Sequence, residues 1–417
     1  MTITRAAVLG CVMGMAAVAA SPVTFNKEVL PLLQKNCQEC HRPGEVAPMS
    51  LLTYSEARPW AKAMKAAVLT QKMPPWFADP KYGHFANDRR LSQEEINVLS
   101  AWADNGAPEG DAKDRPAELD WPSRWAIGKP DAVFEMPKPF PIPATGAVEY
   151  QFLILPTHFT EDKWVQKVEV RPTAGDAVHH AVAYIRPPDS DWLHGRPIGV
   201  PFAVHSVTTS DILMVYTPGI SMDAWPDGMA KKMPAGSDIV LQMHYTTNGT
   251  AKTDQTRVGV VFAKAPPEKA VLTLQLNNTR FVIPPGDPDY KVEVSGTLPN
   301  DALLLSLFPH MHLRGSGFEY LMVDPKGRVE MLLKVNHYDF NWQLTYRLDP
   351  PLPLRAGTRL IANGYFDNSA NNPRNPDPTA EVRYGEQSWQ EMMVCFFDVA
   401  VDARFSKTDF FKRSAPR

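Results

Sequence analysis

The pattern of hydrophobic and polar residues separates a helical part of the chain from a longer β-rich part. Apolar side chains recur at helical spacing within residues 25–35, and a second helix is expected over residues 54–70. Ser92 followed by Glu95 is typical of a capping box, so a third helix should begin there. We therefore expect residues 22–125 to form an all-α domain.

After about residue 145 the apolar side chains instead alternate with polar ones. This period of two predicts strands over residues 164–170, 239–245 and 257–262, and turn residues recur about every ten positions. Short strands separated by regular turns favour two antiparallel β-sandwich (jelly-roll) domains in tandem.

Proline-rich segments mark the expected domain boundaries. Residues 126–145 are rich in proline and are interpreted as an extended linker. Ala265-Pro266-Pro267 makes a second boundary within the β-rich part. The expected units are thus a helical domain of residues 22–125, a first sandwich of residues 146–265 and a second sandwich of residues 266–417.

The composition agrees with a β-rich chain of several domains. Its 417 residues leave room for two or three domains. The 40 prolines suit turns and sheet edges better than long helices. With 43 Lys and Arg against 46 Asp and Glu, the formal net charge is -3. This balance gives no indication of a nucleic acid or an anionic membrane as partner.

The first twenty residues are typical of an export signal. Arg5 precedes an apolar run, and small residues before Ser21 form an acceptable cleavage site. We interpret residues 1–20 as a signal peptide and expect a periplasmic or secreted protein without a membrane span after cleavage. Cys11 follows a weak lipoprotein-like box, which leaves lipidation open.

The segment Cys37-Gln38-Glu39-Cys40-His41 matches the attachment motif of a c-type haem. Two thiols at this spacing bond to the two vinyl groups of one porphyrin, and the next histidine reaches the iron from one face. A metal-binding or redox CxxC pair is the alternative, and both His41 and the export signal argue against it. We expect covalent haem c held by Cys37, Cys40 and His41.

The second axial ligand of the haem should come from later in the same domain. Met73 is our choice, because it lies in a proline-stiffened loop over residues 72–76. Met49 and Met64 are alternatives, and either could simply be part of the core. A haem held by His and Met suits electron transfer better than oxygen chemistry.

The β-rich part carries four further motifs with potential metal ligands. His310 and His312 are two residues apart, so both leave the same face of a strand and form a two-imidazole clamp. His179 and His180 are adjacent, so both can bind one metal only where the strand twists or bulges. The other two motifs are Gln242-Met243-His244-Tyr245 and Glu391-Met392-Met393.

The remaining histidines and nearby aromatic residues receive no functional assignment. We assign no role to His84, His158, His194, His205 or His337, and we expect the aromatic residues within 338–342 to be core.

Taken in order, these motifs resemble the copper motifs of the type II, ascorbate-dependent copper monooxygenases, the peptidylglycine and dopamine hydroxylating family. The resemblance rests on Val178-His179-His180-Ala181, Leu241-Gln242-Met243-His244-Tyr245, Pro309-His310-Met311-His312-Leu313 and Gln390-Glu391-Met392, and it covers about residues 145–410. It implies two copper ions, one in each sandwich.

The resemblance also implies which residues bind each copper. His179, His180 and His244 would form an electron-transfer site, and His310, His312 and Met392 an oxygen-binding, catalytic site. Met393 matches less well, since the Glu-Met pair of the motif aligns with Met392. Imidazole suits both oxidation states of copper, and a thioether favours Cu(I).

The sequence departs from the animal members of this family in three ways. It offers no intrachain disulfide, because Cys395 is alone once Cys37 and Cys40 hold haem. It has Phe308, Val394 and Phe396 where the peptide-hydroxylating members bind a substrate carboxylate, which favours an apolar or aromatic, non-peptide small molecule. A haem domain also precedes the copper motifs, so we expect the haem, fed by an exported electron donor, to pass electrons to copper.

The leading interpretation is an exported haem- and copper-containing monooxygenase that hydroxylates a C–H bond with O2. One alternative is a non-enzymatic electron carrier that contains haem and copper. Another is a copper-binding protein for delivery or sensing. Oxygen consumption separates the enzyme from both alternatives.

Overall fold

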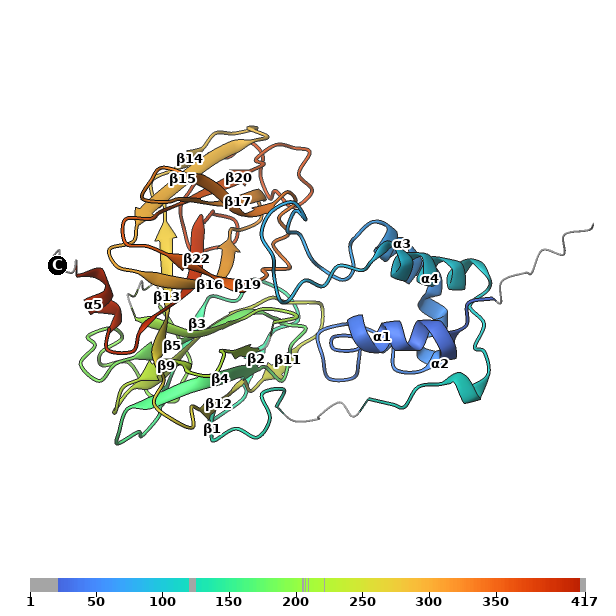
Figure 1. Ribbon diagram of the computed structural model, residues 1–417, viewed down its shortest axis with the longest axis horizontal. Coiled ribbons are helices and arrows are strands. Elements are labelled where there is room, and N and C mark those ends of the chain that lie inside the picture. The colour runs from blue at the N-terminus through green and yellow to red at the C-terminus, as the bar shows by residue number, and fades with distance from the viewer. Residues whose placement is uncertain are drawn as a thin grey trace, which may run out of the picture.

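The computed structural model describes residues 22–119, 125–204, 206, 208, 210–220 and 222–412. The expected signal peptide and Cys11 lie outside these residues. Figure 1 shows a helical part, coloured blue, beside a larger β-rich body. No helix within the described residues is long and apolar enough to cross a membrane.

The helical part contains the three expected helical regions. Ser92 caps the third by accepting a hydrogen bond from the Glu95 amide while the Glu95 carboxylate accepts one from Ser92, which confirms the capping box. The expected helix over residues 54–70 is interrupted, because Pro59 has no amide hydrogen to donate and lies in a tight turn. The elements are η1 (Phe25–Val29), α1 (Leu30–Asn36), α2 (Tyr54–Ala57), η2 (Arg58–Trp60), α3 (Ala61–Leu69), α4 (Gln93–Asp104) and η3 (Ala112–Asp114).

The first pair of sheets encloses a core of buried Val, Leu, Ile and Ala side chains. The strands expected over residues 164–170, 239–245 and 257–262 all form in this pair. One sheet contains β1 (Ala132–Glu135), β12 (Arg257–Phe262), β4 (Lys163–Arg171), β8 (Met222–Ala224) and β9 (Met229–Met233). The other has the order β6 (Phe202–Ala203), β3 (Gln151–Pro156), β10 (Asp238–Tyr245), β5 (Val178–Arg186) and β7 (Asp211–Tyr216).

The second pair of sheets encloses the largest core of the described chain. One sheet has the order β13 (Lys269–Asn277), β22 (Val394–Asp402), β16 (Ala302–His310) and β19 (Tyr346–Leu354). It faces β15 (Tyr290–Thr297), β20 (Arg359–Phe366), β17 (Gly315–Val323) and β18 (Val329–Val335). Smaller elements are β2 (Phe140–Ile142) with β11 (Lys252–Asp254), β14 (Val282–Ile283) with β21 (Val382–Arg383), and α5 (Lys407–Phe411).

The two pairs are joined through one of their sheets. Strand β9 pairs with β13 in parallel, whereas the other strand pairs described are antiparallel. This pairing makes β1, β12, β4, β9, β13, β22, β16 and β19 one continuous sheet. The architecture is therefore mostly β-sheet and agrees with β-sandwich domains, and the two sandwiches are fused side by side.

The proline-rich residues 126–145 contribute strands rather than only a connection. Strand β1 pairs with β12 at the edge of the large sheet, and β2 pairs with β11. Pro141 lies within β2, a short strand in a two-stranded sheet, where a missing amide hydrogen is tolerated. The segment is thus extended, as expected, and is also packed against the first sandwich.

A segment from the helical part lies on the second sandwich. We call residues 76–89, which connect α3 to α4, the docking segment; in Figure 1 the blue chain leaves the helices here and runs onto the β-rich body. Ala78 pairs with Val335 at the end of β18, and Phe85 pairs with Leu348 of β19. Both strands stand at the edges of their sheets, so the docking segment covers two edges that would otherwise expose unpaired backbone groups.

Aromatic side chains anchor the docking segment. Trp76 is buried, with its ring 4.9 Å from that of Tyr346 and 6.0 Å from that of Phe85. Backbone hydrogen bonds from Asp79 to Lys334 (2.7 Å) and from Ala86 to Arg347 (2.8 Å) extend the contact. The helical part is therefore held against the β-rich body rather than tethered by a linker alone.

Candidate metal centres and their shared cavity

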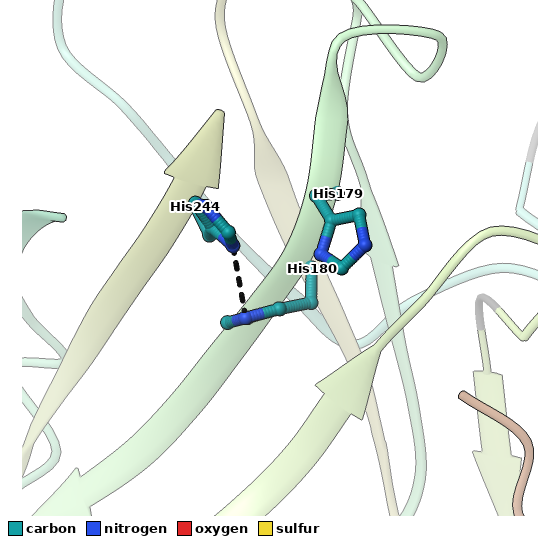
Figure 2. Close-up of side chains that lie close together, drawn as sticks. All are labelled: His179, His180 and His244. Atoms are coloured by element: carbon teal, nitrogen blue, oxygen red, sulfur yellow. Dashed lines mark hydrogen bonds between the residues drawn. The ribbon is translucent and has the colours of Figure 1, made fainter. Parts of the chain in front are cut away.

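The first candidate site consists of His179 and His180 on β5 and His244 on β10. Adjacent residues of a regular strand point to opposite faces. Here the pairing of β10 with β5 skips one residue, because His244 lies opposite His180 while Tyr245 lies opposite Val178. The extra residue is His179, and this β-bulge turns both imidazoles to one side. Figure 2 shows the three rings converging, and one nitrogen of each lies within 4.8 Å of the others.

Hydrogen bonding decides which nitrogen of His179 could bind a metal. Its Nε2 lies 3.2 Å from the carbonyl oxygen of Phe340, which can only accept, so Nε2 carries the proton. The Nδ1 atom is then an acceptor, and it is buried without a hydrogen-bond partner among the described residues. A buried acceptor of this kind fits a metal ligand.

Burial keeps these imidazoles neutral. Desolvation, helped by the neighbouring histidines, lowers the pKa of His179 to about 4 and that of His244 to about 3. The pKa of His180 is also far below its usual range for the same reasons. Neutral imidazole is the form that donates a lone pair to a metal ion, so the cluster is ready to bind one without losing protons.

The second candidate site begins with His310, the last residue of β16, and His312 two residues later. Nδ1 of His310 lies 2.7 Å from the side-chain oxygen of Gln343, which leaves Nε2 of His310 as the acceptor. Nδ1 of His312 lies 3.4 Å from the carbonyl of Gln390, and its Nε2 is buried with no partner in the described part of the chain. The two ring centroids are 5.3 Å apart.

The two methionines before β22 have different surroundings. Met392 lines a cavity that His310 also lines. Met393 is fully buried in the core of the second sandwich, near Met311 and Gly364. Of the two methionines, only Met392 therefore lines the cavity beside His310.

The two candidate sites adjoin each other across one cavity. The rings of His180 and His310 are 6.1 Å apart, centroid to centroid. The cavity has a volume of about 690 Å³ and lies between β5, β7 and β10 on one side and β13, β16 and β22 on the other. Beside His310 and Met392 its wall is formed by Phe308, Val394 and Phe396, the three positions that the sequence analysis associated with substrate.

The haem attachment motif lies at the end of α1, where Cys37 follows the last helical residue. The Nδ1 atom of His41 lies 3.3 Å from the backbone carbonyl of Met49, so Nε2 of His41 is available as an acceptor. Cys37 and Cys40 are free cysteines, and burial raises the pKa of Cys37 to about 12 and that of Cys40 to about 11. Such thiols are unlike the low-pKa cysteines of redox CxxC motifs.

The alternatives for the second haem ligand differ in position. The backbone of Met49 lies on the Nδ1 side of the His41 ring, away from the nitrogen that remains for iron. Met64 is buried in the helical core, and Met73 is half-buried after α3, three residues before the docking segment begins. Met73 therefore stays the predicted ligand, with Met49 and Met64 as the alternatives.

Sequence reasoning missed three residues that hold the candidate ligands in place. Gln343 binds His310, and the Phe340 carbonyl binds His179, as described above. The buried carboxylate of Glu391 accepts backbone hydrogen bonds from His312 (2.9 Å) and Arg314 (2.6 Å), and so ties the His312 loop to the segment that carries Met392. Glu391 could have been noticed in the sequence, because it is a charged residue inside one of the four motifs. Nothing in the sequence pointed to Gln343 or to the Phe340 carbonyl.

Replacing Glu391 by alanine is expected to lower the free energy of unfolding by about 3 kcal/mol, because two buried backbone donors would each lose their acceptor at about 1–3 kcal/mol. Urea unfolding of the metal-free chain measures this change. Glu381, an exposed carboxylate paired with Arg383, is the control, and Glu381→Ala should cost less than about 0.5 kcal/mol. Equal effects of the two substitutions would contradict the assigned role of Glu391.

The stability of the metal-free chain is expected to fall as the pH drops from about 6.5 towards 4. In this window the unfolded chain protonates its histidines at the ordinary pKa of 6.5, whereas folded His179 and His244 resist protonation down to about 4 and about 3. Protons therefore bind preferentially to the unfolded chain, and each pKa unit is worth about 1.4 kcal/mol. Urea unfolding at several pH values measures the slope, and the variant His179→Gln/His244→Gln should show a shallower one. An equal slope for both proteins would refute the prediction.

Comparison with known proteins gives one family. Residues 268–398 match the model of the copper type II ascorbate-dependent monooxygenase, C-terminal domain. The matched range contains His310, His312 and Met392, whereas the first candidate site and the haem motif precede it. The match supports a copper-binding monooxygenase family, and therefore an oxidoreductase, for the second sandwich.

The other comparisons give no match or only distant structural similarity. A search of curated proteins gives no match. Among solved structures, PNGF-II is similar over 65% of this chain and 66% of its own, with 11% identity and a TM-score of 0.30. The major capsid protein P2 from bacteriophage PM2 is similar over 66% of this chain and 98% of its own, with 7% identity and a TM-score of 0.30.

Proposed function

We propose that this chain is an exported haem- and copper-containing monooxygenase that hydroxylates a C–H bond of an apolar, non-peptide small molecule. One observation carries the proposal: two groups of buried, neutral histidines adjoin across a single cavity, in a chain whose second sandwich matches a copper monooxygenase family. The overall reaction consumes the substrate, one O2, two electrons and two protons, and forms the alcohol and water.

The proposed ligands are His179, His180 and His244 for one copper, and His310, His312 and Met392 for the other. The unpartnered nitrogens described above and the thioether beside His310 suit copper in both oxidation states. Copper, when bound, supplies the activation of O2 and the transfer of single electrons. The chain itself holds the imidazoles of His179, His310 and His312 in one tautomer each, because an oxygen acceptor faces the second nitrogen of each ring.

The wall of the cavity supports an apolar substrate. Phe308, Val394 and Phe396 stand beside His310 and Met392 and offer no charge to a carboxylate. Apolar side chains there exclude water and hold a hydrocarbon portion of the substrate against the metal ligands. A substrate with a carboxylate near its reacting carbon would lose its hydration without gaining an ion pair.

The helical part supports the proposed electron supply. Cys37 and Cys40 would bond to the haem, with His41 and Met73 as axial ligands; the haem, when bound, supplies one-electron transfer. The attachment motif faces the β-rich body, since Glu39 lies 3.6 Å from Arg89 of the docking segment and Glu45 lies 3.9 Å from Arg171 of β4. These ion pairs are long and remain partly accessible to solvent, so we expect the buried contacts of the docking segment to hold the orientation.

Export remains part of the proposal. Residues 1–20 would direct the chain to the periplasm or the medium and would then be removed. An exported one-electron donor would reduce the haem. In that compartment the covalent bonds keep the haem on the protein, so retention of the haem does not depend on its non-covalent binding affinity.

The direct test is metal analysis of the mature chain followed by oxygen uptake. With haem attached and copper added, we expect about two copper ions per haem and, after reduction, oxygen consumption that a copper chelator stops. The same chain without copper is the control. Copper binding without copper-dependent oxygen consumption would instead favour an electron carrier or a copper-binding protein.

A further inference from the structure

A loop between β18 and β19 lies between the two candidate copper sites. We call residues 338–345 the bridging loop. At its start the Tyr338 hydroxyl donates to the carbonyl of Met311 (2.8 Å) and accepts from its amide (3.0 Å), between the two histidines of the second site. At its end the carbonyl of Thr345 accepts from the side chain of Asn87 in the docking segment (2.7 Å).

The side chain of Gln343 connects one histidine of each site. Its oxygen lies 2.7 Å from Nδ1 of His310, and its nitrogen donates to the carbonyl of Phe340 at 3.3 Å. The same carbonyl lies 3.2 Å from Nε2 of His179. A chain of three hydrogen bonds therefore runs from His310 through Gln343 and Phe340 to His179.

Chemistry allows only one arrangement of protons along this chain. The Phe340 carbonyl can only accept, so the Gln343 nitrogen must face it and the Gln343 oxygen must face His310. His310 then donates from Nδ1, and His179 donates from Nε2. The nitrogens left over are Nε2 of His310 and Nδ1 of His179, and the latter is one of the buried atoms without a partner in the described chain.

The bridging loop is held rigidly around Gln343. Gln343 is only 2% exposed, and its backbone carbonyl accepts a hydrogen bond from the Thr217 hydroxyl (2.8 Å). The Phe340 ring stacks on the His179 ring, with centroids 4.2 Å apart. Both polar atoms of the Gln343 side-chain amide are hydrogen-bonded, one to His310 and one to the Phe340 carbonyl, so its position is defined. Leaving either buried atom without a partner would cost about 1–3 kcal/mol.

We propose that Gln343 is a positioning residue that orients a ligand of both copper sites at once and provides the hydrogen-bonded path between them. This inference rests on the proposed two-copper function. The sequence analysis assigned the aromatic residues within 338–342 to the core and gave Gln343 no role. With copper bound at both sites, this path would carry an electron from the first site to the second without a bond forming or breaking, and an external reductant would have to supply two electrons per turnover to restore both sites.

Two substitutions of Gln343 test its two roles separately: the orientation of His310 and the hydrogen-bonded path to His179. Gln343→Leu removes both hydrogen bonds and should weaken copper binding at the second site by about 10–100-fold, as loss of a ligand's hydrogen-bond partner typically does. Gln343→Glu keeps an acceptor for His310, but its carboxylate cannot donate to Phe340. This variant should retain second-site affinity and slow electron transfer between the sites. Gln93→Leu, at an exposed position of α4 outside the cavity, is the control and should change neither property.

The experiment measures copper affinity by competition with a chelator. It follows electron arrival at the second site by the infrared band of carbon monoxide bound to Cu(I). Wild-type copper content is determined first, because failure to bind two copper ions would overturn the proposed function itself. If the wild type binds two and either Gln343 variant matches Gln93→Leu in both measurements, the inference about Gln343 is wrong while the proposed function stands. Should Gln343→Leu fail to fold, the transfer rate of Gln343→Glu decides alone.

Discussion

Oxygen consumption is expected to fall by more than about 100-fold when His310 is replaced by alanine, because loss of only a ligand's hydrogen-bond partner already costs about 10–100-fold. His310 is the proposed ligand whose ring lies closest to the other site, 6.1 Å from that of His180, and it also lines the cavity. Its removal leaves His312 and Met392 as an incomplete ligand set. The measurement combines copper content with oxygen uptake after reduction.

Copper content makes this prediction specific. The first site uses other residues, so His310→Ala should retain about one copper ion per haem. His158→Ala is the matched control, since His158 is exposed and contacts neither candidate site. Undiminished oxygen uptake by His310→Ala would exclude the second site as the place of the reaction.

Replacing both Cys37 and Cys40 by serine is expected to abolish covalent haem attachment. A serine hydroxyl does not add to the haem vinyl groups, so denatured protein should show no haem stain on a gel. Copper content should stay unchanged, since both candidate copper sites lie in the β-rich body. Oxygen uptake driven by a donor that reduces only haem should stop, whereas uptake driven by a small reductant of copper should continue.

Cys395→Ser is the matched control for the double substitution. Cys395 is buried on β22, where its thiol donates to the carbonyl of Leu276, and serine can make the same bond. This variant should keep its covalent haem. If the Cys37/Cys40 variant sustains full uptake from the haem-specific donor, electrons reach copper without the haem and the proposed order of transfer fails.

Local pattern was sufficient for the three helical regions and the three strands that the sequence analysis predicted. The Ser92 capping box begins α4, and the alternation over residues 257–262 is strand β12. The broken helix over residues 54–70 could have been read from Pro59, whose ring removes an amide hydrogen. These features depend on residues close in the chain, where spacing decides the structure.

The candidate site could be predicted only in part. Motif order suggested which histidines belong together, and the family match over residues 268–398 covers only His310 and His312 of them. Whether His179 and His180 face one side depended on a β-bulge, which the pairing of β5 with β10 decides. The choice between Met392 and Met393 likewise depends on the fold of the segment before β22, which places Met392 at the cavity and Met393 in the core.

The sequence alone therefore determined the helical and β-rich parts, and it predicted a haem attachment motif and a set of copper ligands. Only the tertiary structure decided that the two histidine groups adjoin, that residues 76–89 pack on the second sandwich and that Gln343 lies between His310 and His179. The physical reason is separation along the chain. These contacts join residues that are tens to hundreds of positions apart, and such pairings follow from sheet packing rather than from local periodicity.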